Sequence, residues 1–152
     1  MLKEGEKFPD FDLPDQSGER VKLADLLGKP FVIYFYPKDD TSGCTKEACG
    51  FRDAMPNLPV PVLGVSPDSV ESHQRFASKY DLNFRLLADP ERSLIEKCGL
   101  WVEKSMYGRK YMGVNRSTFL VGKDGRVLKA WHKVKPADHA EEVKEAVREI
   151  LD

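Results

Sequence analysis

The chain has 152 residues, enough for one domain that buries roughly 68–70% of its unfolded surface without a metal ion or a disulfide. Its 24 Lys and Arg residues balance 25 Asp and Glu residues with the two signs interspersed, which argues against nucleic acid or an anionic membrane as a partner. The apolar runs are far shorter than the about 20 residues of a transmembrane helix, and the N-terminus does not resemble a secretory signal. We therefore predict a single domain over residues 1–152, located in the cytoplasm.

The first predicted elements are a small hairpin and a central strand. Residues 11–13 and 21–23 flank the turn-rich segment Pro14-Asp15-Gln16-Ser17-Gly18, which favours a hairpin. Aromatic and β-branched residues then run without interruption over residues 31–36. A run this continuous predicts a strand that is buried on both faces of a central sheet.

The middle of the chain alternates between strand and helix patterns. Strands are predicted at residues 60–65 and 84–87. Between them Asp68-Ser69-Val70-Glu71 resembles a capping box, which predicts the start of a helix. A second helix is predicted to begin after Asp89-Pro90 and to end near Gly99.

The C-terminal third predicts a hairpin followed by a helix. Strands at residues 117–121 and 126–131 enclose Gly122-Lys123-Asp124-Gly125, whose Asp-Gly pair favours a tight turn. Apolar residues then recur at helical spacing over a charged opposite face, at Val143, Ala146, Val147, Ile150 and Leu151. Strands that alternate with helices and end in a hairpin and a helix predict a mixed-sheet α/β fold.

The segment after the central strand carries the chemistry. Residues 37–49 change from turn residues to helix formers, which predicts a strand–loop–helix transition with Cys44 in the first turn of the helix. Free N–H groups and the helix dipole stabilise a thiolate there, and the thiolate is the nucleophilic form of cysteine. A single cysteine is more often a small buried hydrophobe. Cys44, however, follows Gly43 at the strand exit, beside the hydroxyls of Thr41 and Ser42, where α/β sheets bind ligands.

Three segments resemble one family. The motif Pro37-x-x-x-Thr41-x-x-Cys44 resembles the active-site motif of the peroxiredoxins, and residues 35–45 are similar to the bacterioferritin-comigratory-protein branch, also called peroxiredoxin Q. The similarity extends through residues 106–114 and 116–121. It implies a thioredoxin-like α/β fold, with a central mixed sheet, helices on both faces and an N-terminal β-hairpin extension. It also implies thiol-dependent reduction of hydrogen peroxide and organic hydroperoxides.

The resemblance also implies a role for each residue of the motif. Cys44 is the peroxidatic nucleophile, and Thr41 donates a hydrogen bond to the peroxide while it accepts one near the thiolate. Pro37 shields the pocket, and Arg116 places its guanidinium beside Cys44, where its fork of donors aligns the peroxide oxygens. Pro37, Thr41, Gly43 and Arg116 are thus the expected substrate-binding residues.

Two further residues near this motif have more than one interpretation. Glu47, one turn after Cys44, can pair with Arg116 and orient it, but a glutamate in a first turn also suits the helix dipole without any catalytic role. Cys98 lies beside Leu94 and Ile95 on a predicted core face. We interpret Cys98 as a buried structural thiol.

Cys49 is the expected partner of Cys44. A sulfenic acid condenses with a nearby thiol to a disulfide before it is oxidised further, and Cys49 is the nearby thiol. The resemblance makes it the resolving cysteine of members with this five-residue offset, with a core position as the alternative. In an α-helix that offset separates the Cα atoms by roughly 8.6 Å, whereas a disulfide needs less than about 7 Å. The helix must therefore unwind locally for the disulfide to form.

The expected partners follow from the resemblance as well. Electrons come from a dithiol protein, most plausibly thioredoxin, so no cofactor is expected. This branch is often monomeric, and we expect a monomer, with a dimer as the alternative.

Four other functions compete with this interpretation. A thioredoxin-like disulfide exchanger usually has Cys-x-x-Cys, whereas four residues separate Cys44 and Cys49 here. A hydrolytic cysteine enzyme could use His73, His132 or His139 as base, but none lies in a recognisable catalytic context. A zinc site lacks paired ligand spacing. The fourth is a peroxide sensor, which stops after about one equivalent of peroxide, whereas an enzyme continues when a reductant is supplied.

Overall fold

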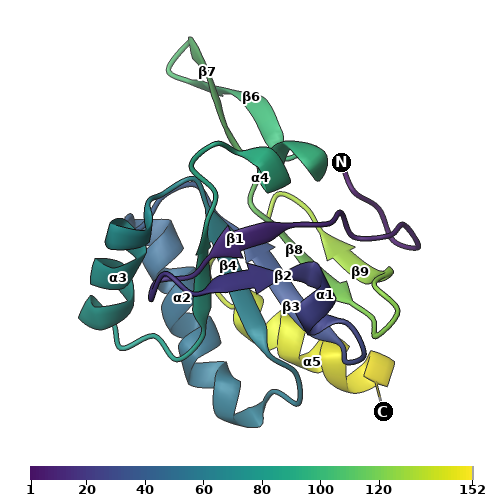
Figure 1. Ribbon diagram of the computed structural model, residues 1–152. Helices are drawn as coiled ribbons and strands as arrows, with labels where there is room; N and C mark the ends of the chain where they lie inside the picture. The colour runs from purple at the N-terminus through teal and green to yellow at the C-terminus, as the bar shows by residue number, and fades with distance from the viewer. Residues whose placement is uncertain (152) are drawn as a thin grey trace.

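The computed structural model describes residues 1–151, so Asp152, the last residue of the predicted domain, lies outside the described residues. Figure 1 shows a central sheet with helices around it and one hairpin that projects from the body. In chain order the elements are β1 (Asp12–Pro14), β2 (Arg20–Lys22), α1 (Leu23–Leu26), β3 (Phe31–Phe35), α2 (Ser42–Ala54), the 3-10 helix η1 (Met55–Asn57), β4 (Val62–Ser66), α3 (Val70–Lys79), β5 (Arg85–Ala88), α4 (Ser93–Lys97), β6 (Trp101–Met106), β7 (Arg109–Val114), β8 (Ser117–Val121), β9 (Val127–Trp131) and α5 (His139–Leu151).

The main sheet has five strands in the order β5-β4-β3-β8-β9. Strands β3, β4 and β5 run parallel, whereas β8 pairs antiparallel with both β3 and β9. The sheet is therefore mixed, as predicted. The predicted hairpin turn is also present, since β8 and β9 are joined across Gly125, which has a φ of 86°.

Strand β3 is the centre of the core. Phe31, Ile33 and Phe35 pack into one apolar cluster, whereas Val32 and Tyr34 pack into another. Their exposed fractions are 0% or 1%. Successive side chains of a strand point to opposite faces, so the two clusters lie on the two sides of the sheet. The strand is thus buried on both faces, as its continuous apolar run predicts.

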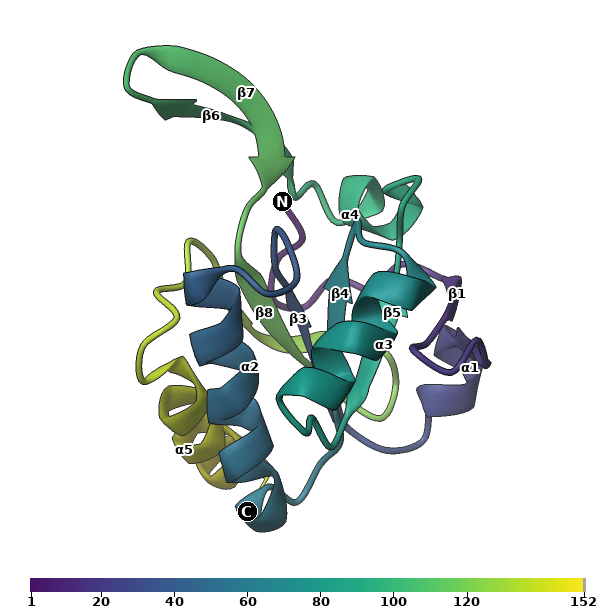
Figure 2. The same cartoon turned by 90° about the vertical axis from the view of Figure 1, so that its left-hand side faces the viewer.

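Different elements cover the two faces. Helices α2, α3 and α5 contribute Phe51, Phe76 and Val143 to the cluster that contains Tyr34. The N-terminal hairpin and helix α4 contribute Val21 and Ile95 to the cluster that contains Phe31. Figure 2 shows α2 and α5 side by side on one side of the sheet and β1 and α1 on the other. The predicted N-terminal hairpin is present, with β1 paired antiparallel to β2.

The predicted capping box is wrong by one residue. Helix α3 has Ser69 as its N-cap, and the Ser69 hydroxyl accepts from the backbone N–H of Ser72 at 3.1 Å. The Asp68 carboxylate instead accepts hydrogen bonds from the Ser66 hydroxyl and the Asp39 backbone N–H. Asp68 is thus engaged with other segments, which leaves the cap to Ser69.

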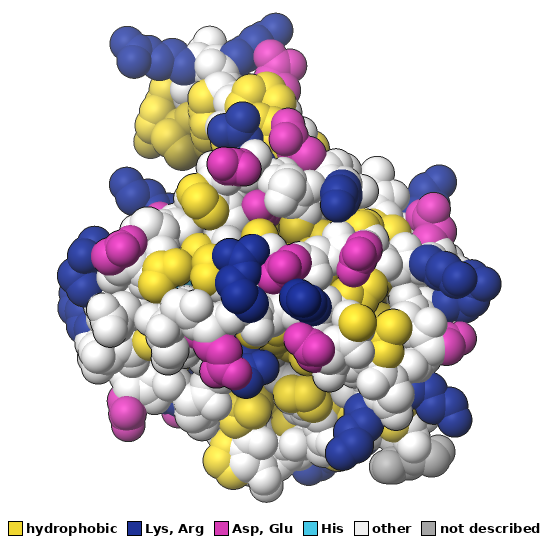
Figure 3. Space-filling model, in the orientation of Figure 1, with side chains coloured by type: hydrophobic (Ala, Val, Ile, Leu, Met, Phe, Trp, Pro, Cys, Tyr) yellow, Lys and Arg dark blue, Asp and Glu magenta, His cyan; other side chains and the backbone are white. Residues whose placement is uncertain are grey.

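The hairpin of β6 and β7 is not predicted from the sequence. Its turn contains Tyr107 and Gly108, with φ values of 51° and 79°, and positive φ at both positions is typical of a type I′ turn. Met106, Tyr107, Tyr111 and Met112 are exposed on it, and Figure 3 shows apolar and basic side chains gathered on this projection. None of the helices within residues 1–151 has the length and apolar character needed to cross a membrane.

Candidate active site

Cys44 lies in the first turn of α2, as predicted. The helix begins at Ser42 with Thr41 as its N-cap, and the Thr41 carbonyl accepts the first helical hydrogen bond from Thr45 at 2.8 Å. Cys44 is 1% exposed and belongs to the same apolar cluster as Tyr34. The N-terminal end of the helix is thus directed at a thiol that is almost completely shielded from solvent.

Arg116 joins Cys44 to Glu47. Its Nη2 lies 3.1 Å from the sulfur of Cys44, and its Nη1 donates to Oε1 of Glu47 at 2.8 Å. Arg116 lies in the loop between β7 and β8, so chain segments that are far apart in the sequence converge here. The two arms of one planar guanidinium therefore hold a fixed geometry between the thiol and the carboxylate.

Burial and charge set the electrostatics of this group. Burial raises the pKa of Glu47 to about 7, even though Arg116 beside it opposes that shift. Burial alone would lower the pKa of Arg116, but the neighbouring Glu47 and Cys44 outweigh it and raise the value above its usual range. Arg116 therefore remains a cation beside the Cys44 sulfur, while Glu47 titrates near neutral pH.

Gly43 lies beside this group, and Pro37 begins the loop that leads to it. A Cβ atom on Gly43 would lie 3.4 Å from Nη2 of Arg116 and 3.2 Å from Cγ of Pro136. Glycine thus leaves the space that the guanidinium uses beside Cys44. Pro37 follows β3 directly and is half-buried. Sequence reasoning missed Pro136, because nothing in its local pattern marks it as a neighbour of Gly43.

The hydroxyl of Thr41 forms a different hydrogen bond from the one expected for it. It donates to the carbonyl of Lys38 at 2.9 Å. A peroxide that is to receive this hydrogen bond must therefore replace that carbonyl as the acceptor. The side chain of Thr41 is exposed, so it is free to reorient.

The other two cysteines occupy different environments. Cys49 is half-buried in the continuous helix α2, and both Cys44 and Cys49 are free thiols in this structure. Cys98 is 1% exposed and packs in the cluster on the opposite face of the sheet. Burial, and secondarily Asp89, raises the pKa of Cys98 to about 12.

The histidines that could serve a hydrolytic enzyme form hydrogen bonds elsewhere. His73 bonds to Asp39 and to the Leu87 carbonyl. His132 bonds to Ser117 and Leu2, and His139 bonds to Thr118 and Glu142. Within residues 1–151 these contacts engage both ring nitrogens of each histidine, and none of them involves a cysteine.

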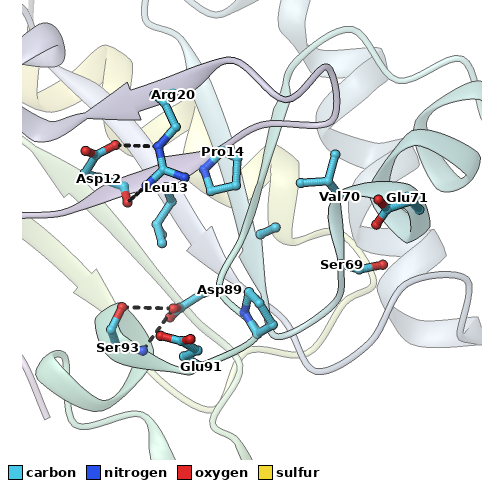
Figure 4. A pocket seen from close by; sticks show the side chains of 12 residues that line it. Asp12, Leu13, Pro14, Arg20, Ser69, Val70, Glu71, Asp89, Glu91 and Ser93 are labelled. Atoms are coloured by element: carbon cyan, nitrogen blue, oxygen red, sulfur yellow. Dashed lines mark hydrogen bonds and ion pairs between the residues drawn. The ribbon is translucent and has the colours of Figure 1, made fainter.

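Two cavities lie at different distances from this site in the fold, and one of them is lined by Arg116. One of about 370 Å³ adjoins Arg116 and is lined by Val102, Lys104 and Val134, among others. Another of about 450 Å³ lies between the N-terminal hairpin and the start of α3 (Figure 4). Its lining includes Asp12, Asp89 and no cysteine. The lining of the cavity at Arg116 contains no cysteine either, and its link to Cys44 is the Arg116 guanidinium, which lies 3.1 Å from the sulfur.

Comparison with known proteins gives one consistent result. The AhpC/TSA family matches residues 5–130. Peroxiredoxin Bcp of Bacillus subtilis is 48% identical over 151 residues, which cover 97% of this chain and 96% of that protein. Peroxiredoxin Bcp of Escherichia coli is 45% identical over 141 residues, which cover 91% of this chain and 90% of that protein.

Solved structures agree with the sequence relatives. The bacterioferritin comigratory protein of Xanthomonas campestris, studied for alkyl peroxide reduction, has a TM-score of 0.88 and 39% identity, covering 93% of this chain and 92% of that chain. A variant of Xylella fastidiosa PrxQ has a TM-score of 0.94 and 33% identity, covering 100% of this chain and 99% of that chain. The fold is therefore the thioredoxin-like fold of these proteins. The chain belongs to the AhpC/TSA family and is a peroxiredoxin, a thiol-dependent peroxidase of the type that includes Bcp and peroxiredoxin Q.

Proposed function

We propose that Cys44 reduces the hydroperoxide and that Cys49 resolves the product as an intramolecular disulfide. The single observation that carries this assignment is the Arg116 fork, which lies 3.1 Å from the Cys44 sulfur and 2.8 Å from Glu47. A cation at this distance favours the thiolate, which is the attacking species. Glu47 holds the second arm of the fork and so orients the first.

In the first step the Cys44 thiolate attacks the terminal peroxide oxygen. The S–O bond forms as the O–O bond breaks, so that sulfur is oxidised to a sulfenic acid and the leaving oxygen takes a proton and departs as water or an alcohol. Arg116 stabilises the charge that develops on the oxygens, and Thr41 donates to the peroxide after it leaves the Lys38 carbonyl. Pro37 and Gly43 shape the entrance, and the cavity beside Arg116 accommodates the organic part of an alkyl hydroperoxide.

In the second step the Cys49 thiol condenses with the sulfenic acid, which yields the disulfide and one water. Helix α2 is continuous across both cysteines, and ideal helix geometry separates their Cα atoms by roughly 8.6 Å. The disulfide tolerates less than about 7 Å, so the first turn of α2 must unwind. Amide hydrogen exchange over residues 41–53 measures this, because protection is expected to fall in the oxidised protein. Equal protection in the two redox states would contradict the unwinding.

In the third step a thioredoxin-type dithiol protein reduces the disulfide and restores both thiols. The unwound turn exposes the disulfide to this partner. We propose that the protein acts in the cytoplasm as a monomer, with a dimer as the alternative. The near balance of charge gives no reason to invoke nucleic acid.

A steady-state assay tests this function against that of a sensor. Hydrogen peroxide or an alkyl hydroperoxide is supplied in many-fold excess over the protein, with thioredoxin, thioredoxin reductase and NADPH. The proposal predicts that NADPH is consumed continuously until the peroxide is exhausted. Consumption that stops after about one equivalent per protein would instead identify a sensor.

A further inference from the structure

The loop before Cys44 is tied to the body of the protein by a buried carboxylate. The Asp39 side chain is 3% exposed, and its Oδ1 accepts from the Tyr36 hydroxyl at 2.6 Å. Its Oδ2 accepts from the Ser72 hydroxyl at 2.8 Å and lies 2.7 Å from Nδ1 of His73. The two partners on α3 thus hold a residue of the loop that leads into the active-site helix.

The hydrogen bonds of His73 define where its protons lie. Its Nε2 is 2.9 Å from the Leu87 carbonyl, which can only accept, so Nε2 carries a hydrogen. A second proton must lie between Nδ1 and the Asp39 carboxylate, because two bare acceptors do not approach to 2.7 Å. Asp39 also accepts from two hydroxyls, so both of its carboxyl oxygens are engaged. His73 and Asp39 are therefore joined by a short, buried hydrogen bond that shares one proton.

The same distances argue against a metal ion. Asp39, Asp68 and His73 offer ligand atoms that lie within 4.8 Å of one another. However, two ligands that each lie about 2.1 Å from one ion stand roughly 3 Å or more apart. The 2.7 Å between His73 and Asp39 is shorter, and it matches a direct hydrogen bond.

We propose that the Asp39–His73 pair is a latch that keeps the active-site loop in its peroxide-reducing conformation and opens when α2 unwinds. This inference rests on the proposed function, since it concerns the step between the sulfenic acid on Cys44 and the Cys44–Cys49 disulfide. The latch joins the moving segment to parts of the core that stay folded, because His73 is 0% exposed and reaches β5 through Leu87. A buried hydrogen-bonded pair resists partial separation, since a buried polar group without a partner is costly. The latch is therefore either closed or open.

The latch sets the fate of the sulfenic acid. While it is closed, Cys49 cannot reach Cys44, and a second peroxide can oxidise the sulfenic acid to a sulfinic acid, releasing water or an alcohol. When it is open, Cys49 condenses with the sulfenic acid and releases water. A weaker latch therefore speeds the second reaction at the expense of the first.

The variant Asp39→Asn keeps the shape of the side chain and replaces one of its acceptor oxygens with an amide that can only donate. Stopped-flow measurements are expected to show disulfide formation that is roughly tenfold faster, since the short buried hydrogen bond to His73 is lost. Reaction of the thiol with peroxide is not expected to become faster, because that step uses the closed conformation. Sulfinic acid formation at high peroxide, measured by mass spectrometry, is expected to fall. Ser72→Ala removes one donor to Asp39 and keeps the His73 contact, so it is expected to change the disulfide rate and the sulfinic acid yield by a smaller factor.

Two controls separate a latch from general loosening. Asp40→Asn alters the adjacent acid, which binds Lys79 and Tyr80 but is 43% exposed, so only a small change in the disulfide rate is expected. Ile95→Val weakens the core on the opposite face of the sheet, where Ile95 is 0% exposed, and lowers the melting temperature without touching the loop. If Ile95→Val accelerates disulfide formation as much as Asp39→Asn does, the effect is one of stability and the latch is wrong.

The latch can also be tested on the wild-type protein, so that the result does not depend on whether a variant folds. Nitrogen-15 NMR of the His73 ring is expected to show two slowly exchanging N–H groups in the reduced protein and rapid exchange in the disulfide form. Equal protection of the ring in both forms, with the Cys44–Cys49 disulfide confirmed by mass spectrometry, would overturn the latch and leave the proposed function intact. Failure of the wild type to form that disulfide would overturn both.

Discussion

Cys44 and Cys98 are equally buried, each 1% exposed, but they lie on opposite faces of the central sheet in opposite environments. Cys44 occupies the first turn of α2 and has the Arg116 guanidinium 3.1 Å from its sulfur. Cys98 lies at the C-terminal end of α4, where burial and Asp89 raise its pKa to about 12. Exclusion of water is therefore common to both thiols. The proposed roles, with Cys44 as nucleophile and Cys98 as structural residue, rest on the cationic partner that lies beside the Cys44 sulfur.

The largest expected effect comes from replacing each thiol in turn. Cys44→Ser is expected to lower peroxide turnover by at least about 10³-fold, because an alcohol cannot supply the thiolate. Cys98→Ala is expected to keep turnover within about twofold of the wild type while lowering the melting temperature by a few degrees, because it only removes packing. Steady-state assays and thermal unfolding of both variants test the contrast. A folded Cys44→Ser protein with appreciable turnover, or a stable Cys98→Ala protein without it, would reverse the assignment.

Replacing Arg116 by Lys tests whether the geometry of the cation matters beyond its charge. Lysine keeps the charge but loses the planar fork that reaches Cys44 and Glu47 together. The second-order rate constant for peroxide is expected to fall by about 10- to 100-fold, which stopped-flow kinetics measures directly. A wild-type rate constant in Arg116→Lys would show that a point charge suffices.

The last expected effect is on stability rather than turnover, and it concerns the charge of Glu47 and the pH dependence of unfolding. Burial raises the pKa of Glu47 from 4.5 to about 7, so between these values the folded state holds a proton that the unfolded state has lost. The stability that this proton contributes is complete below pH 4.5 and is lost as pH rises through about 7, by up to about 3 kcal/mol. Glu47→Gln removes this dependence. Urea denaturation between pH 4.5 and 8 is expected to show the wild type losing stability relative to the variant, and parallel curves would contradict the shift.

Much of the fold and part of the candidate site can be predicted from local sequence. The continuous apolar run of β3 predicts its burial on both faces, and the change from turn residues to helix formers predicts the position of Cys44. These signals are local because a strand or a helix start depends on neighbouring residues. The pairing of Arg116 with Cys44 was expected only from the resemblance to a family, because Arg116 belongs to a distant segment.

The features that were not predicted depend on contacts that sequence patterns do not encode. The β6–β7 hairpin was missed because Tyr107 adopts a positive φ that its residue type does not favour. The Asp39–His73 pair joins a loop to a helix through tertiary packing, so neither residue carries a local signal of the other. The capping box was predicted one residue away from the observed cap at Ser69 for the same reason, since the backbone N–H of distant Asp39 engages the Asp68 carboxylate.

The most direct test of the contrast between the two thiol environments is to map every cysteine after a single equivalent of hydroperoxide. Reduced protein is treated, unfolded, alkylated and digested, and its peptides are identified by mass spectrometry. The proposed mechanism predicts a disulfide between Cys44 and Cys49, with Cys98 recovered as the alkylated thiol. Oxidation of Cys98, or recovery of Cys44 as an alkylated thiol after the peroxide has been consumed, would contradict it.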